Sequence, residues 1–191
     1  SLPFSLSFEV KGEEQKRALL IAGWGKSAYN FSSLLSQAEW VLQKKRFTQI
    51  ETLSQPALVD LEYTMEGFDP NNTDQILAYL IGLTGKDIDQ DTLFLLNPNE
   101  TISLDTLNTW LDAFTSSSQV VLLDAPEAED FFKEATTQPS DKRIYLWSAS
   151  SGQMASLEQR GDCAFSRFFF TCIYRGASVY QAYLSSTDAI K

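Results

Sequence analysis

The side chains that could do chemistry gather just after one apolar run. Val120–Leu123 is a continuous stretch of apolar residues, as is typical of a strand buried on both faces of a parallel sheet. Asp124, Glu127 and Glu129 follow it. In open α/β sheets, ligands and catalytic groups lie just past the carboxyl ends of the strands. Carboxylates in such a place can act as general acid and base where their environments separate their pKa values.

The sequence contains no histidine. This removes the commonest general acid/base and the commonest metal ligand, and with it every serine–histidine or cysteine–histidine nucleophile pair. The two cysteines, Cys163 and Cys172, match no metal-binding spacing, and we interpret them as buried small apolar residues. The sequence leaves open whether they form a disulfide. We expect no cofactor and no metal.

Two other motifs match ligand-binding loops only in part. Gly25-Lys26-Ser27 follows a predicted strand as the end of a phosphate-binding loop would, but Leu20 stands where that loop needs its first glycine. Asp87–Asp91 starts like a calcium loop, yet Thr92 and Pro98 stand where glycine and glutamate are needed. We therefore interpret both segments as turns.

The charge balance is acidic. The 191 residues include 25 acidic and 15 basic side chains, and this net charge of −10 argues against nucleic acid or an anionic membrane surface as the main partner. No stretch of about 18 apolar residues could insert into a membrane. The opening Ser1-Leu2-Pro3 suggests a domain of a longer protein. Compartment and oligomeric state stay open, with a secreted or extracytoplasmic location as one alternative.

Strands and helices are predicted to alternate along the chain. A leading strand or linker at 1–16, with an alternating pattern at Phe4–Val10, precedes a main domain at 17–191. The predicted strands of that domain are Arg17–Ala22, Phe47–Leu53, Leu93–Leu96, Val120–Leu123 and Arg143–Ser148. The predicted helices are 31–46, 73–83, Leu104–Phe114, 127–135, Cys163–Tyr174 and Val179–Ile190. This order indicates an α/β fold with a mostly parallel sheet and helices on both faces.

The order and spacing of these elements resemble the caspase/legumain clan, and most of all its bacterial caspase-like, legumain-related domains. The similarity covers about residues 17–190. It rests on the strand, glycine turn and long helix at 17–46, Trp110-Leu111-Asp112, Leu123-Asp124-Ala125, the strand Arg143–Ser148, Gly161, Phe165-Ser166, Phe168-Phe169, Gly176, Val179 and Ala182. The resemblance implies a caspase-like three-layer α/β sandwich.

In that family the third strand ends in Asp-His-Gly and the fourth in Asp-Ala-Cys. The thiolate is the nucleophile, the histidine moves protons, and backbone N–H groups bind the oxyanion. The resemblance implies that these motifs fall on Asn97-Pro98-Asn99 and Asp124-Ala125-Pro126, so that proline replaces both reactive residues. Proline offers no nucleophile and no backbone N–H, and Glu127 and Glu129 would repel a developing negative charge.

The sequence therefore predicts a catalytically inactive, peptidase-like module that binds protein or neighbouring domains of the same chain. The alternative is a hydrolase that uses the carboxylates of Asp124, Glu127 and Glu129, with Ser148 nearby. A deep pocket enclosing at least two of these carboxylates would favour the hydrolase, whereas a flat or proline-filled surface would favour the binding module. Two geometric expectations accompany this interpretation. Asp124 and Asn97 should lie at adjacent strand ends, and Phe165, Phe168 and Phe169 should belong mostly to the core.

Overall fold

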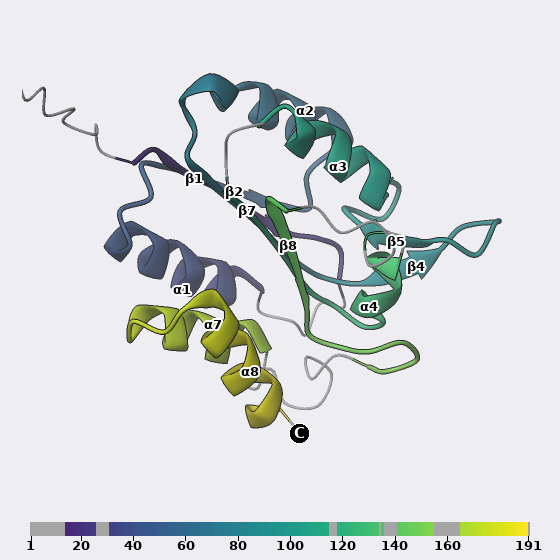
Figure 1. The fold of residues 1–191 in the computed structure, drawn as a ribbon. Helices are drawn as coiled ribbons and strands as arrows, with labels where there is room; N and C mark the ends of the chain where they lie inside the picture. The colour runs from purple at the N-terminus through teal and green to yellow at the C-terminus, as the bar shows by residue number, and fades with distance from the viewer. Residues whose placement is uncertain are drawn as a thin grey trace, which may run out of the picture.

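The computed structural model describes residues 14–25, 31–114, 118–133, 135, 141–154 and 165–190. The predicted strand Phe4–Val10, Lys26-Ser27, Gly161 and Cys163 lie outside these residues. A five-stranded parallel sheet forms the centre of the molecule, in the order β2-β1-β3-β7-β8 (Figure 1). Its strands are β1 Lys16–Ala22, β2 Gln49–Ser54, β3 Gln75–Ile81, β7 Ser118–Asp124 and β8 Arg143–Trp147.

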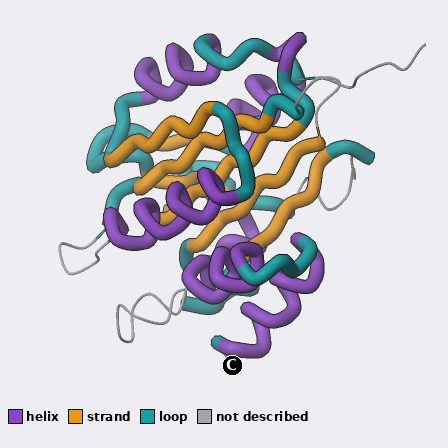
Figure 2. The backbone as a smooth tube through the Cα atoms, turned by 90° about the vertical axis from the view of Figure 1, so that its left-hand side faces the viewer, coloured by secondary structure: helices purple, strands orange, loops and turns teal. Residues whose placement is uncertain are grey.

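Helices cover both faces of this sheet, as the second view also shows (Figure 2). One face carries α1 Phe31–Lys44, α7 Phe165–Tyr174 and α8 Val179–Ala189. The other face carries α2 Leu58–Glu66, α3 Leu104–Asp112 and α4 Ala128–Phe131, with the 3₁₀ turn η1 Pro70–Asn72 after α2. A small antiparallel sheet, β4 Thr84–Lys86, β5 Thr92–Leu95 and β6 Thr101–Ile102, packs beside α4. The predicted three-layer α/β architecture is confirmed.

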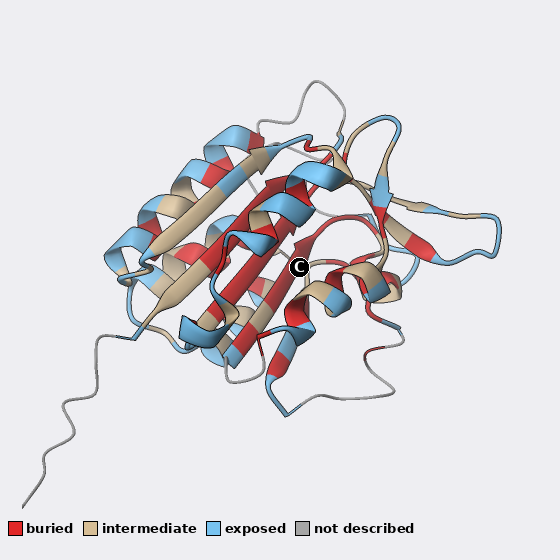
Figure 3. Ribbon diagram, turned by 90° about the horizontal axis from the view of Figure 1, so that it is seen from above, coloured by how far each residue is buried: buried red, intermediate tan, exposed pale blue. Residues whose placement is uncertain are grey.

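The strands are continuous apolar runs because both of their faces are covered. Successive side chains of a strand point to opposite faces, and in β1 Leu20 joins the core under α1 while Leu19 and Ile21 join the core under α2 and α3. The strands in the middle of the sheet are buried along most of their length (Figure 3). Among the described residues, no helix has the length and apolar character needed to cross a membrane.

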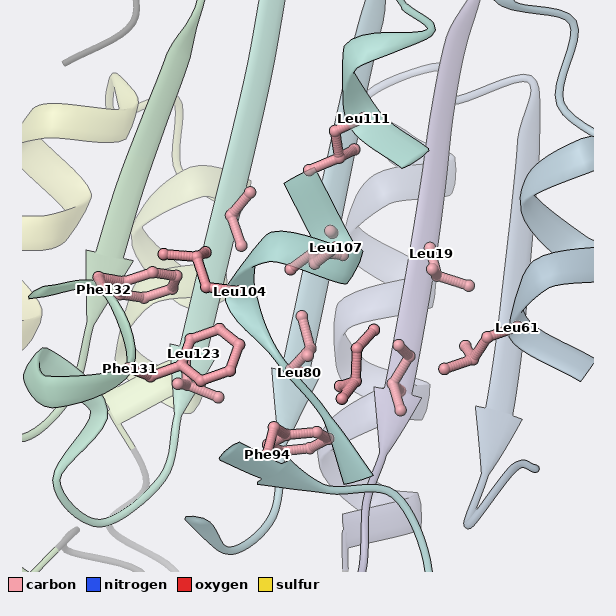
Figure 4. Packing of buried hydrophobic residues seen from close by; sticks show 14 of the residues in the cluster. Leu19, Leu61, Leu80, Phe94, Leu104, Leu107, Leu111, Leu123, Phe131 and Phe132 are labelled. Atoms are coloured by element: carbon pink, nitrogen blue, oxygen red, sulfur yellow. The ribbon is translucent and has the colours of Figure 1, made fainter. Parts of the chain in front are cut away.

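Each face has its own core. On the α2 and α3 face, Leu19, Leu80 and Leu123 of three strands lie opposite leucines of the helices (Figure 4). On the other face, Phe165 and Phe169 of α7 are fully buried and their rings stack with centroids 6.1 Å apart. Phe168 is only half buried. The prediction that this aromatic cluster belongs mostly to the core is thereby confirmed.

Two predicted elements are wrong. The segment 73–83 is not a helix, because Gln75–Ile81 forms β3 in the middle of the sheet. A short apolar run without clear periodicity fits a buried helix and a buried strand equally well. Leu93–Leu96 is not a strand of the main sheet either, since β5 pairs antiparallel with β4 and β6. The third strand of the main sheet is therefore β3.

Candidate functional site

The carboxyl ends of β1, β3, β7 and β8 meet at one edge of the molecule. Gly82 N donates a hydrogen bond to Asp124 O at 3.2 Å, and Ser148 N donates to Leu123 O at 3.1 Å. Gly23 N donates to Ile81 O at 2.8 Å. Glycine is needed at position 23 for close approach, since a Cβ there would collide with the carbonyl of Leu95. This edge of the sheet is where the topology places a site.

Asn97 lies far from this meeting point, so the predicted adjacency of Asn97 and Asp124 is wrong. The Asn97 side-chain amide donates to Pro56 O at 2.9 Å and to Glu100 Oε2 at 2.7 Å. Pro56 follows β2, the outer strand at the other side of the sheet. Pro98 is exposed in the turn after β5. The prediction failed because it placed β5 in the main sheet.

The segment that does lie beside Asp124 is Gly82–Gly85, which turns after β3 and enters β4 at Thr84. Ile81, the last residue of β3, pairs with Asp124 in the register of the sheet. Thr84 Oγ1 donates a hydrogen bond to Pro126 O at 2.6 Å and so joins this turn to the one after β7. Our sequence analysis did not identify Thr84. The two glycines that flank it, directly after an apolar run, are a turn signal that could have located it.

Pro126 is buried in the turn between β7 and α4. The next residue, Glu127, has left-handed backbone torsion with φ of 51°, which is rare outside glycine and tends to occur at functional turns. Glu127 N donates to Gln153 O at 3.0 Å, and Glu129 N donates to Ala149 O at 3.0 Å. These backbone N–H groups are thus bonded within the protein and do not point at an open site.

The predicted carboxylates do not gather around one cavity. Asp124 is buried against α7, whereas Glu127 is partly exposed and Glu129 Oε2 accepts a hydrogen bond from Ser151 N at 3.1 Å. The geometry expected of a paired-carboxylate hydrolase is therefore not found among these residues. Ser148, the other candidate, accepts a hydrogen bond from Ala125 N at 3.2 Å.

Asp124 is a buried carboxyl group that holds the first turn of α7. Its Oδ2 accepts a hydrogen bond from Ser166 N at 2.9 Å, and the residue is 1% exposed. Burial raises the pKa of Asp124, and the hydrogen bonding from Ser166 opposes that rise. A negative charge at a helix N-terminus also interacts favourably with the helix dipole. The role that this geometry shows for Asp124 is structural.

Further polar atoms near Asp124 lack partners. Among the described residues, Asp124 Oδ1 and the Tyr79 hydroxyl make no hydrogen bond of good geometry. Burial, and after it the charge of Asp124, raise the pKa of Tyr79 well above its ordinary value. The sequence predicted no role for Tyr79, and it pointed to Ser166 only as part of the family resemblance, without a contact to Asp124. A tyrosine inside a buried apolar strand was the one available signal.

Near this edge of the molecule, the described residues line two cavities. One of about 320 Å³ is bordered by β4, β5, α3 and α4 and carries both charges, with Lys86, Asp105 and Asp130 among its lining residues. The other, of about 480 Å³, lies between the end of β8 and α8 and is lined by Trp147, Ser148, Ala149, Ser150, Gln153, Met154, Tyr183, Thr187 and Ile190. None of Asp124, Glu127 and Glu129 lines either cavity. In the described part of the chain, no group of three His, Cys, Asp or Glu side chains could hold a metal ion.

The fold is similar to that of a caspase of known structure. The crystal structure of drICE superposes with a TM-score of 0.54 over 85% of this chain and 74% of that chain, at 12% sequence identity. No family model matches the sequence, and no curated protein matches it. At this identity the likeness establishes the fold alone. The chain is a caspase-like α/β sandwich.

Proposed function

We propose that this protein is a catalytically inactive, caspase-like module that binds protein, either a separate partner or a neighbouring domain of its own chain. The observation that carries the proposal is the turn after β7. There the resemblance assigns the nucleophile to Pro126, which has neither a reactive atom nor a backbone N–H. Pro126 is also buried, and its carbonyl is bonded to Thr84.

The turn after β3 supports the same proposal. In the family that the sequence resembles, the third strand ends in the motif that carries the histidine. Because the third strand of this sheet is β3, we assign that motif to Gly82–Gly85 in place of Asn97-Pro98-Asn99. This turn holds no general base, and the chain has no histidine anywhere. Cys172 is a half-buried residue of α7 and belongs to neither turn.

The alternative, a hydrolase built on carboxylates, has less support. Such an enzyme needs two carboxyl groups that face one substrate site and have separated pKa values. Asp124 is engaged with the N-terminus of α7, and Glu129 accepts a bond from Ser151. A rearrangement of both groups would be needed before they could act on the same bond.

The test is hydrolysis of a peptide panel by the full chain, with acidic, basic and asparagine residues before the scissile bond. We expect no turnover above buffer. The matched variants are Cys163→Ser, Cys172→Ser, Asp124→Asn and Glu129→Gln. Turnover that disappears in a cysteine variant would contradict the proposal outright. Turnover that disappears in Asp124→Asn or Glu129→Gln would establish the carboxylate hydrolase instead.

A further expectation concerns restoration of the motif. Pro126→Cys alone introduces a thiol with an ordinary pKa near 8.5 and no base to ionise it. Adding Thr84→His supplies a base but removes the hydrogen bond to Pro126 O, and the carboxylates of Glu127 and Glu129 stay close by. We expect little peptidase activity from the single or the double variant in the same assay.

A further inference from the structure

The outer edge of β8 has no strand partner among the residues that the structure describes. Gln119 N donates to Lys142 O at 2.8 Å, and Ser148 N donates to Leu123 O at 3.1 Å. In this parallel register, the even-numbered residues of β8 bond to β7. The backbone N–H and C=O groups of Arg143, Tyr145 and Trp147 therefore point away from the sheet. β8 forms the near edge of the sheet in Figure 1.

The other outer strand, β2, differs in character. Its side chains are mainly polar or charged, with Glu51 in its middle, and natural sheets use such residues to keep an edge unpaired. β8 instead presents Ile144, which is 51% exposed, and holds no acidic residue. Of the two edges, β8 is the one suited to pair with another chain.

The 480 Å³ cavity begins where this edge ends. Trp147 is the last residue of β8 and also lines the cavity, facing Tyr183 of α8 with ring centroids 6.5 Å apart. The other lining residues are uncharged, and Met154 is 60% exposed at the rim. A cavity of this size with aromatic and hydroxyl groups suits an apolar side chain. Next to the lining residue Ser150, Ser151 donates hydrogen bonds to the carboxylates of Glu129 and Asp130, each at 3.1 Å, so acidic groups lie beside the cavity.

We propose that the edge of β8 binds an extended segment of another polypeptide as an added strand, with one apolar side chain of that segment in the cavity beyond Trp147. This inference rests on the proposed function, because it requires binding without cleavage. An extended chain can form hydrogen bonds with a row of alternating backbone N–H and C=O groups. A pocket beside that row gives specificity, because it accepts only a side chain that fits it. In the partner segment, a lysine or arginine next to the apolar residue would have the charge opposite to that of the acidic surface.

A second copy of the protein is a poorer occupant of this edge. Each copy carries a net charge of −10, so pairing two copies through a five-residue strand brings like charges together. A short basic segment has the opposite charge. The structure thus favours a partner segment over self-association, and the experiment below distinguishes the two.

The experiment is amide hydrogen exchange by NMR on the full chain, with the capped peptide Lys-Val-Thr-Val-Thr-Phe-Lys as the probe. At a peptide concentration about ten times the dissociation constant, we expect the amides of Tyr145 and Trp147 to exchange about tenfold more slowly. The amides of Ile144 and Leu146 already bond to β7 and should change little. The same peptide with alternate backbone nitrogens methylated should give no protection.

A pair of variants tests the cavity. Thr187→Phe fills the cavity and so excludes the apolar side chain of the peptide. Peptide binding should weaken by at least about tenfold, because the burial of one apolar side chain contributes that much. Ser185→Phe places the same side chain on an exposed position of α8 outside the cavity and should leave binding unchanged. Equal binding by both variants would overturn the placement of the apolar side chain.

Three outcomes overturn the proposal or its foundation, and they are distinguishable. Absence of protection at Tyr145 and Trp147 by the peptide overturns the β8 proposal and leaves the inactive module standing. Protection of the same amides without peptide, rising with protein concentration, identifies a second copy as the occupant and also overturns it. Cleavage of the probe, read by mass spectrometry, contradicts the proposed function itself.

Discussion

The two ends of the β7–β8 pair differ in how well their buried polar groups are hydrogen-bonded. At the amino end, the Arg143 side chain is 6% exposed and fully engaged. Its Nε donates to Gln119 Oε1, while its two terminal nitrogens donate to Asn108 Oδ1 and Asp112 Oδ1, each at 2.7 Å. The Gln119 amide in turn donates to the carbonyls of Leu111 and Phe114. This network fixes α3 to the two strands.

At the carboxyl end, the buried carboxyl of Asp124 has one bonded oxygen, Oδ2, and one without a partner among the described residues. A buried polar group that lacks a partner lowers stability. The two ends of the β7–β8 strand pair therefore have different roles. The amino end stabilises the fold, whereas the carboxyl end anchors α7 at the edge where α/β sheets carry their sites.

Breaking the amino-end network should have the largest effect. Arg143→Met leaves Gln119 Oε1 without its buried donor and Asn108 Oδ1 with only the Tyr145 hydroxyl. Because two buried hydrogen bonds to a charged group are lost, at about 1.5–3 kcal/mol each, we expect the free energy of unfolding to fall by about 3–5 kcal/mol. Chemical denaturation measures this. The control is Asp112→Asn, whose side chain is 73% exposed and should matter by only about 0.2–1 kcal/mol. Similar losses in both variants would show that the network is not what stabilises this end.

The bond from Asp124 to α7 should have the next largest effect. Asp124→Ala and Asp124→Asn are both uncharged, but only asparagine keeps an acceptor for Ser166 N. We expect the alanine variant to be less stable by about 1–3 kcal/mol, because a buried N–H then has no partner. Denaturation, together with faster amide exchange in the first turn of α7, reports this. Equal stability of the two variants would mean that the bond anchors nothing.

The bond between the two turns should have the smallest effect. Thr84→Val removes the donor to Pro126 O, and we expect a loss of about 1 kcal/mol in unfolding free energy. Thr84→Ser keeps the hydroxyl and serves as the matched control in thermal unfolding. If serine destabilises as much as valine, the lost methyl packing and not the hydrogen bond is responsible.

The sequence predicted most of the sheet, because strands buried on both faces are continuous apolar runs that end at turn residues. β1, β7 and β8 and the helices α1, α3, α7 and α8 are confirmed near their predicted positions. β3 was missed because Gln75–Ile81 follows residues that also cap helices. That error moved the segment expected beside Asp124 from the end of β3, at Ile81 and Gly82, to Asn97.

The sequence predicted only the part of the site that depends on local sequence information. Asp124 and Pro126 follow directly from the end of an apolar run, which is local information. The contact of Asp124 with Ser166 joins residues 42 positions apart and depends on how α7 packs on the sheet. No local pattern encodes such a contact, and the same holds for the hydroxyl of Tyr79.

The pH dependence of stability in Asp124→Asn tests the central claim, that the carboxyl end keeps a buried carboxyl at a cost in stability. Burial raises the pKa of Asp124 in the folded protein above its ordinary value of 3.8, so the native state binds the extra proton. The contribution of this carboxyl is then greatest below the unfolded pKa and is lost as the pH rises through the folded pKa.

The measurement is the unfolding free energy of the unmodified protein minus that of Asp124→Asn, followed from about pH 7 down to the unfolded pKa near 4. Taking this difference removes the titration of the other acidic groups. The account predicts that the unmodified protein gains stability relative to the variant as the pH falls. A relative gain as the pH rises would mean a depressed pKa and a well-paired carboxylate, and would contradict it.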